Sequence, residues 1–375
     1  MNRLLAILFC VAIVTGCAKK EQSDTAEPGS PEIIDLDEVL SAEYSKDSTS
    51  VDKARLIPLE ATDESLIGFI ESIKIGGKYM YIGCLSSDFE LMIFDTDGHY
   101  VNRLKTGNGP GEVAYPEKFT YDKYRDQLLV YQYGTVKKYS PTGEYIGNCT
   151  IPFCISDFVA IVDGYLVIIS EIQNQSGAFW ALKTDTDFNV VKDIRIDAPY
   201  RRFSSDHITE NADNEIIIPH AYDNNLYVYT DSTVTVKQIL KYDDHQYDLS
   251  NINDMDEGEL SRIMLHSEKT LFTKFYYETN NYQRFDMEPF FPIFRNKVNN
   301  RCTAGRFSQI PLHFVVGTCG EYFVGWCNNE LISFDTKEAE DNYYKAMTAL
   351  TPEEVSALRN MSPDDNPFVL LFSLK

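Results

Sequence analysis

The chain has 375 residues, of which 43% are hydrophobic and 13% aromatic, so it is large and apolar enough to bury a sizeable core. Its 34 Lys and Arg against 57 Asp and Glu give a formal net charge of −23. An acidic surface repels phosphate backbones, so the composition argues against nucleic acid as a partner.

The first residues have the features of an export signal. The apolar run Leu4–Val14 is too short to cross a bilayer as a helix. It ends in Val14-Thr15-Gly16-Cys17, which resembles the lipobox of bacterial lipoproteins, where a cysteine after small residues is diacylated and becomes the mature N-terminus. An ordinary secretory peptide with a chance cysteine is the alternative. We expect a lipoprotein signal peptide over 1–16, lipidation of Cys17, and a polar, flexible tether over 17–32.

After the tether, one kind of turn recurs every 45 residues. Segments with alternating apolar residues end at four positions, each followed by a turn sequence: Phe94, Tyr139, Thr184 and Tyr229. A period of about 40–50 residues with several strands per unit is typical of propeller blades. Each unit has apolar faces on both sides, so we expect it to be stable only when it packs against a neighbour.

The regular step is lost after Tyr229. The next turn that matches the pattern follows Phe334-Asp335, 105 residues further on instead of 90. We expect the 15 additional residues within Asp243–Leu271, because Asp254–Leu265 has helix-forming character.

The end of the chain is predicted to contain helices and a closing strand. Thr351, followed by Pro and two acidic residues, predicts the start of a helix, and Glu338–Leu350 is also expected to be helical. A closed ring needs one blade that both termini complete. Either Ile33–Leu36 or Ala54–Leu59 could donate the strand that meets the apolar segment Phe368–Leu374.

These patterns predict an all-β fold, a six-bladed β-propeller over residues 33–375 with short helical insertions in the C-terminal third. We expect the protein to be a monomer. The blades are expected at roughly 54–105, 111–150, 151–197, 198–242, 260–300 and 302–375.

The segment Lys105–Tyr145 is similar to the NHL repeat. It contains Gly109-Pro110-Gly111-Glu112, then Asp122 and a closing Gly143. In NHL repeats a Gly-rich stretch precedes the inner strand, an Asp marks a turn, and the blade ends in a hairpin with glycine. The later blades depart from this pattern, since Phe188 stands where a turn glycine is expected.

The whole chain also resembles the exported six-bladed propeller lipoproteins of Bacteroides-type bacteria. The resemblance implies a lipid-anchored protein of the outer membrane, on its periplasmic face or at the cell surface, and it does not bring a reaction with it. The matching segments are the lipobox, Arg55–Glu60, Gly109–Glu112 and Asp364–Pro367.

Ligand sites in propellers commonly lie at the mouth of the central channel, where loops between blades converge. Two guanidinium groups lie beside aromatic residues within Pro199–Phe203, and such groups bind carboxylates while aromatic rings stack on sugar faces. Salt bridges between blades are the simpler interpretation of these arginines. The candidate ligand-binding residues are Glu112, Tyr115, Arg201, Arg202, Phe203, His207, His220, Arg301 and Arg306.

The sequence contains no compact catalytic set. The six histidines show no metal-ligand spacing, no nucleophile elbow is present, and no Cys pattern indicates structural zinc. Asp95-Thr96-Asp97-Gly98 resembles the start of a calcium loop, but Thr106 stands where the bidentate Glu would be, so we interpret it as a hairpin turn. We expect no metal and no cofactor.

We therefore expect a binding or interaction module of the cell envelope, whose ligand is a glycan, a peptide or an envelope protein. One alternative is a propeller enzyme, a lyase or hydrolase with its site at the channel mouth. Another is a structural partner in an outer-membrane complex, which predicts a broad apolar patch on one face.

Overall fold

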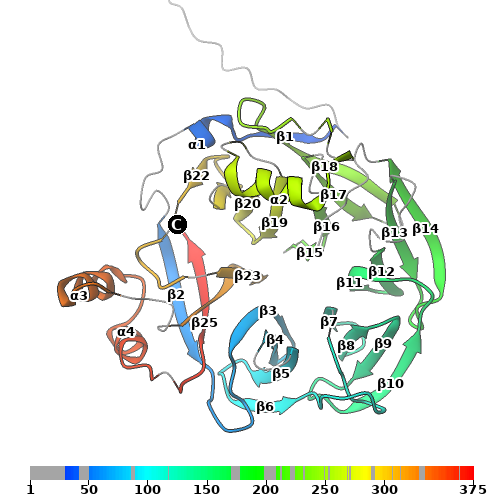
Figure 1. Ribbon diagram of the computed structural model, residues 1–375, viewed down its shortest axis with the longest axis horizontal. Coiled ribbons are helices and arrows are strands. Elements are labelled where there is room, and N and C mark those ends of the chain that lie inside the picture. Colours follow the sequence, from blue (N-terminus) through cyan, green and yellow to red (C-terminus); the bar gives the residue numbers. More distant parts are fainter. Residues whose placement is uncertain are drawn as a thin grey trace, which may run out of the picture.

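Six β-sheets are arranged around a central channel in this computed structural model (Figure 1). The all-β, six-bladed propeller predicted from the 45-residue step is confirmed. The structure describes residues 30–41, 50–85, 89–116, 118–169, 178–197, 208–211, 213–219, 224–230, 233–248, 250–251, 254–267, 269, 272–288, 292–305, 307–312, 314–328, 334–362 and 364–375.

In blades 1 to 5 the antiparallel strands follow one another in chain order from the channel outward. Blade 1 contains β3 (Phe69–Gly76), β4 (Tyr79–Leu85), β5 (Phe89–Asp95) and β6 (Tyr100–Arg103). Blade 2 contains β7 (Lys118–Asp122), β8 (Gln127–Gln132), β9 (Thr135–Tyr139) and β10 (Tyr145–Thr150). Blade 3 contains β11 (Ile155–Ile161), β12 (Gly164–Ile169), β13 (Ala178–Thr184) and β14 (Val190–Asp197).

The remaining three blades follow the same plan, and blades 4 and 6 also receive strands from the ends of the chain. Blade 4 contains β15 (Thr209–Glu210), β16 (Ile216–Pro219), β17 (Asn225–Thr230) and β18 (Thr233–Lys241). Blade 5 contains β19 (Phe272–Glu278), β20 (Tyr282–Glu288), β21 (Pro292–Asn296) and β22 (Cys302–Ala304). Blade 6 contains β23 (Phe314–Cys319), β24 (Tyr322–Cys327), β25 (Phe368–Leu374) and, outermost, β2 (Val51–Pro58).

The recurring turn marks the end of the third strand in blades 1 to 4, which explains the 45-residue step. The turn after the third strand of blade 3 contains no glycine. Phe188 adopts a positive φ of 63° there, and its buried ring stacks on Tyr165 with centroids 4.3 Å apart. Aromatic packing thus compensates for a backbone conformation that a bulky residue rarely adopts.

The predicted position of the later turn is wrong. Phe334 and Asp335 lie just before a helix, α3 (Lys337–Ala346), and the third strand of blade 6 is β25, which ends at Leu374 instead. Two insertions disturb the step: α2 (Glu257–His266) precedes blade 5, as predicted, and α3 with α4 (Pro352–Arg359) lies within blade 6.

The ring closes through the N-terminal segment, and one of the two predicted closures is confirmed. Strand β2 pairs antiparallel with β25, from Val51 opposite Leu374 to Pro58 opposite Phe368. The other candidate segment forms β1 (Glu32–Asp35), which pairs in parallel with β18 on the outside of blade 4 and leads into α1 (Asp37–Ser41) (Figure 1). Residues 51–58 therefore belong to blade 6, not to blade 1.

Candidate functional site

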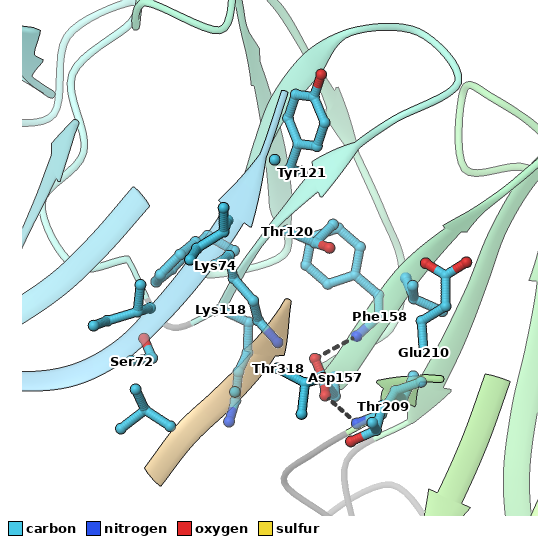
Figure 2. Close-up of a pocket in the computed structure, with 18 of the residues that line it drawn as sticks. Ser72, Lys74, Lys118, Thr120, Tyr121, Asp157, Phe158, Thr209, Glu210 and Thr318 are labelled. Carbon is cyan, nitrogen blue, oxygen red and sulfur yellow. Dashed lines mark hydrogen bonds between the residues drawn. The ribbon is translucent and has the colours of Figure 1, made fainter. Parts of the chain in front are cut away.

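A cavity of about 600 Å³ occupies the central channel, and all six inner strands contribute to its lining (Figure 2). We call the end of the ring where the inner strands begin the proximal face, and the opposite end the distal face. Phe89 and Pro116 line the cavity near the proximal face, and Gly77 and Gly320 line it in distal turns. The volume is in the range of small-molecule sites in proteins.

Four of the inner strands carry a β-bulge near their proximal ends. A bulge adds one residue to a strand and re-aims the neighbouring side chains, and bulges are common beside functional sites. The register shifts lie between Ile70 and Ser72, Ile155 and Asp157, Thr273 and Phe275, and Val315 and Gly317. In blade 3 the bulge places Asp157 in the wall of the channel.

Asp157 is a buried carboxylate that joins blade 3 to blade 4. Its oxygens accept the backbone N–H groups of Phe158 at 2.8 Å and of Ile208 at 2.6 Å (Figure 2). Burial raises the pKa of this carboxyl above its usual value, while the charges of Lys74 and Lys118 act in the opposite direction. The hydrogen bond to Ile208 gives Asp157 a structural role in the packing of the two blades.

Lys74 and Lys118 supply positive charge to the same part of the channel. Their side chains extend from β3 and β7 on the side of the cavity that faces Asp157 (Figure 2). Both are half-buried, and neither forms an ion pair with any residue that the structure describes. Two unpaired ammonium groups in a partly closed cavity attract an anion more strongly than exposed lysines do, because the effective dielectric is lower there.

Hydroxyl groups line the channel between these charges. Ser72, Thr120, Thr209 and Thr318 come from four different inner strands. The hydroxyl of Thr209 donates to the backbone oxygen of Tyr276 at 2.8 Å, which links blade 4 to blade 5. The other three hydroxyls are small polar groups of the kind that orient a ligand in a pocket.

In the distal part of the cavity, the lysine charge is neutralised by an ion pair within the protein. Lys123 pairs with Glu210, and its ammonium group also donates to Asn214 at 2.8 Å. These contacts connect blade 2 with blade 4 beside the cavity. Of the lysines that line the cavity, Lys74 and Lys118 are therefore the two that form no ion pair with a described residue.

Glu112, a predicted ligand-binding residue, is held in its own turn. Its carboxylate accepts the backbone N–H of Gly109 at 2.9 Å and pairs with Lys105 at 2.6 Å. The hydrogen bond from Lys105 is the main reason that the pKa of Glu112 is lowered. At Gly107, with a φ of 149°, an added Cβ would lie 2.2 Å from this carboxylate, so the Gly-rich segment provides space for it. Glu112 does not line the cavity.

Tyr115 lies on the proximal face, next to the cavity. Its exposed ring packs against Phe89, with centroids 5.4 Å apart, and Phe89 lines the cavity. Arg301 lies in the turn between β21 and β22, the two outer strands of blade 5, and its backbone N–H donates to Asn299. The other predicted residues lie outside the described part of the chain: Arg201, Arg202, Phe203, His207, His220 and Arg306.

Lys74, Lys118 and Asp157 are not among the site residues predicted from the sequence. The signal present in the sequence is a charged residue inside a short apolar strand, as in Lys118–Asp122 and Ile155–Ile161. Alternation alone does not distinguish a residue facing a channel from one facing solvent. Within the described ranges, no group of three or more His, Cys, Asp and Glu side chains has the arrangement of a metal site.

Comparisons with known proteins agree with this fold. A protein from Bacteroides fragilis NCTC 9343 that is described as exported has a similar structure, with a TM-score of 0.69, 15% identity, and coverage of 92% of this chain and 99% of that one. A member of the DUF4221 family from Bacteroides vulgatus has a TM-score of 0.50 and 13% identity, and the match covers 88% of this chain and 98% of that one. No curated protein matches the sequence. The model of a domain of unknown function, DUF4934, matches residues 31–373, and the chain therefore belongs to this family.

Proposed function

We propose that this protein is an exported, lipid-anchored propeller that binds an anionic ligand in its central channel. The observation that carries the proposal is the pair of ammonium groups of Lys74 and Lys118, which face a cavity of about 600 Å³ without an ion-pair partner in the described structure. Three lysines and three acidic residues line the cavity, and only Lys123 among these lysines is engaged in an ion pair within the described structure, so a ligand carboxylate can pair with the other two.

The lining supports binding of a small ligand or of the end of a larger one. Hydroxyl groups around the channel can hydrogen-bond to a polar ligand, and the buried Asp157 helps fix the geometry of the wall. The inner strands hold these groups on a rigid framework, which lowers the entropic cost of binding.

The N-terminal segment supports anchoring at a membrane. Leu4–Val14 and Cys17 fit a lipoprotein signal, and the first described residues reach the ring at the outer edge of blade 4. A tether that starts at Cys17 and ends before β1 would then hold the ring near the outer membrane by its rim and leave the channel open to ligands.

A ligand screen tests the binding function. We expect saturation-transfer NMR with the full-length chain in detergent to detect at least one ligand among small acidic saccharides, acidic peptides and organic acids. Thr318→Trp fills the channel and should abolish that signal. Thr150→Trp, on the exposed outer strand of blade 2, is the matched control and should preserve it. A ligand that binds equally to Thr318→Trp, or a screen without any ligand, would refute the proposal.

Mass spectrometry tests the anchor. We expect the mature protein to begin at Cys17 and to carry the mass of diacylglycerol on that residue. An unmodified N-terminus, or retention of residues before Cys17, would show that the anchor is absent.

A further inference from the structure

A row of exposed aromatic side chains lies on the proximal face. Phe314, Phe69, Tyr115 and Tyr133 come from blades 6, 1 and 2, and they are 50%, 42%, 46% and 70% exposed. We call these four residues the aromatic row. Large exposed rings that gather at one end of a protein commonly mark a binding surface.

The aromatic row is continuous with the channel. The ring of Phe314 packs edge to face against Phe69 at 6.1 Å, and Tyr115 stacks on Tyr133 at 6.5 Å. Phe89 contacts Tyr115 and lines the cavity. A ligand on the aromatic row can therefore extend into the channel.

The chemistry changes along this path. Outside are flat apolar rings, two of which carry hydroxyl groups. Inside are the hydroxyls of Thr120 and Thr318 and the unpaired ammonium groups of Lys74 and Lys118. A complementary ligand has flat apolar faces, many hydroxyl groups and negative charge in the same molecule.

We infer that the proximal face binds an acidic oligosaccharide, with sugar rings on the aromatic row and a carboxylate-bearing sugar in the channel. This inference rests on the function proposed above and names its ligand class. Sugar rings have flat C–H faces that stack on aromatic rings, and their hydroxyls match the threonines. An apolar peptide would place no anionic group beside the two lysines, and a simple inorganic anion would leave the aromatic row uncovered.

Calorimetric titration of the full-length chain in detergent tests the ligand class. The two probes are an oligogalacturonate and a neutral galacto-oligosaccharide of equal length. We expect the acidic probe to bind at least about tenfold more tightly at low ionic strength. This preference should decrease as salt is added, because the lysines are only half-buried.

Two kinds of variant separate charge from stacking. Lys74→Gln with Lys118→Gln should remove the preference for the acidic probe but retain binding of both probes. Tyr133→Asn should weaken both probes, and asparagine tolerates the positive φ of 44° at this position. The matched controls are Lys78→Gln with Lys192→Gln, and Tyr124→Asn in the turn between β7 and β8, which should bind as the parent does.

The inference is overturned if oligogalacturonate does not bind, or if its affinity is unchanged in both the lysine and the tyrosine variants. In that case a fragment that Thr318→Trp excludes would still support the channel as a ligand site. If oligogalacturonate does not bind and no ligand is excluded by Thr318→Trp, the proposed function itself is refuted.

Discussion

The N-terminal segment adds a strand to two different blades, and different forces hold the two additions. Strand β2 completes blade 6 through an antiparallel ladder with β25, and Leu56 and Ile57 are buried there. Strand β1 lies in parallel on the outer edge of blade 4 and forms a shorter ladder with β18. Ile34 packs into the core beneath β1, whereas Ile33 is 64% exposed.

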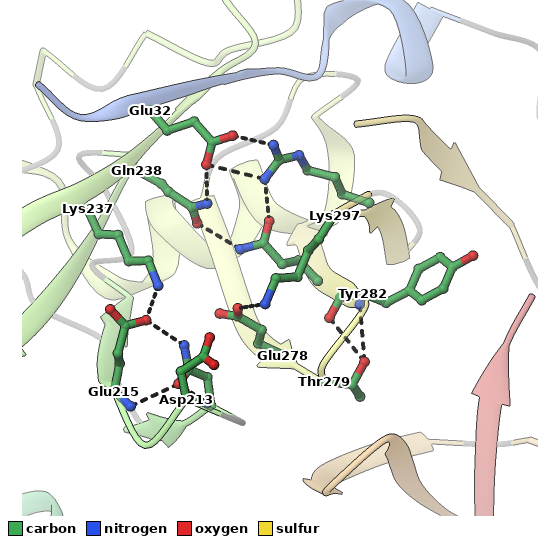
Figure 3. Close-up of polar contacts among 12 residues, drawn as sticks. Glu32, Asp213, Glu215, Lys237, Gln238, Glu278, Thr279, Tyr282 and Lys297 are labelled. Carbon is green, nitrogen blue, oxygen red and sulfur yellow. Dashed lines mark hydrogen bonds and ion pairs between the residues drawn. The ribbon is translucent and has the colours of Figure 1, made fainter. Parts of the chain in front are cut away.

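A polar network secures β1 (Figure 3). Glu32 accepts a hydrogen bond from Gln238 at 2.7 Å and pairs with Arg295, whose guanidinium group is buried in the neighbouring blade 5. Arg295 also donates to Gln283 at 2.7 Å, and Gln283 donates to Gln238 at 2.9 Å. The network thus connects the N-terminal strand with two blades at once.

The two strands therefore have different structural roles. Strand β2 closes the ring, so weakening it should destabilise the whole propeller. Strand β1 covers the edge of a ring that is already closed, so weakening it should act locally. Four substitutions or conditions test this difference, from the largest expected effect to the smallest.

Phe372→Ala should have the largest effect. Phe372 is fully buried in β25, between β24 and β2, and its ring packs against Phe323 at 5.5 Å. Replacing a buried phenylalanine by alanine costs about 3–5 kcal/mol of the free energy of unfolding. Urea denaturation monitored by tryptophan fluorescence measures this cost. Val191→Ala, at an exposed position on β14, is the control and should change stability by less than about 0.5 kcal/mol.

Asn366→Ala tests the hydrogen bonds between blade 6 and the segment that leads into blade 1. The buried amide of Asn366 accepts the N–H of Ile67 at 2.7 Å and donates to the backbone oxygens of Glu60 and Ser65. Its removal leaves buried polar groups without partners, at a cost of about 2–3 kcal/mol. The same denaturation assay should detect this as global destabilisation. A loss confined to local amide exchange around Ile67 would contradict a role in ring closure.

Arg295→Met should act on β1 alone. Methionine keeps most of the side-chain volume but removes the donors to Glu32 and Gln283, at a cost of about 1–3 kcal/mol for the partners left unsatisfied. Hydrogen exchange followed by mass spectrometry should show faster exchange in Glu32–Asp35 and unchanged exchange in Val51–Pro58. Equal acceleration in both segments would show that β1 contributes to ring closure.

Acidification should destabilise β1, and this should be the smallest of the four changes in free energy. Burial raises the pKa of Glu32, but hydrogen bonds from Gln238 and Arg295 outweigh this effect, so the pKa lies below its usual value of 4.5. Because the pKa of Glu32 is lowered in the folded state, its ionised carboxylate stabilises β1 fully above pH 4.5. This contribution is lost as the pH falls through the folded-state pKa. Exchange in β1 should therefore accelerate at acidic pH in the parent protein. In Glu32→Gln it should show less dependence on pH over that range.

The C-terminal third contains one feature that was predicted correctly from the sequence and one that was not. The cap at Thr351 was predicted correctly, and the structure adds that Glu354 completes a capping box and also accepts the N–H of Leu56 at 2.8 Å. The turn assigned to Phe334-Asp335 was wrong because two helices interrupt blade 6. A count of residues between turns cannot tell an insertion between blades from one within a blade.

The sequence by itself determined the features that depend on neighbouring residues: the alternation of the strands, the recurring hairpin turns, the helix cap at Thr351 and the apolar closing strand at Phe368–Leu374. These follow from backbone geometry and burial within a few residues. Only the tertiary structure decided the pairing of Glu32 with Arg295, 263 positions apart, and the convergence of Lys74, Lys118 and Asp157 on one channel. Such contacts depend on how many blades close the ring and on where bulges turn the inner strands, and neither is encoded in a local pattern.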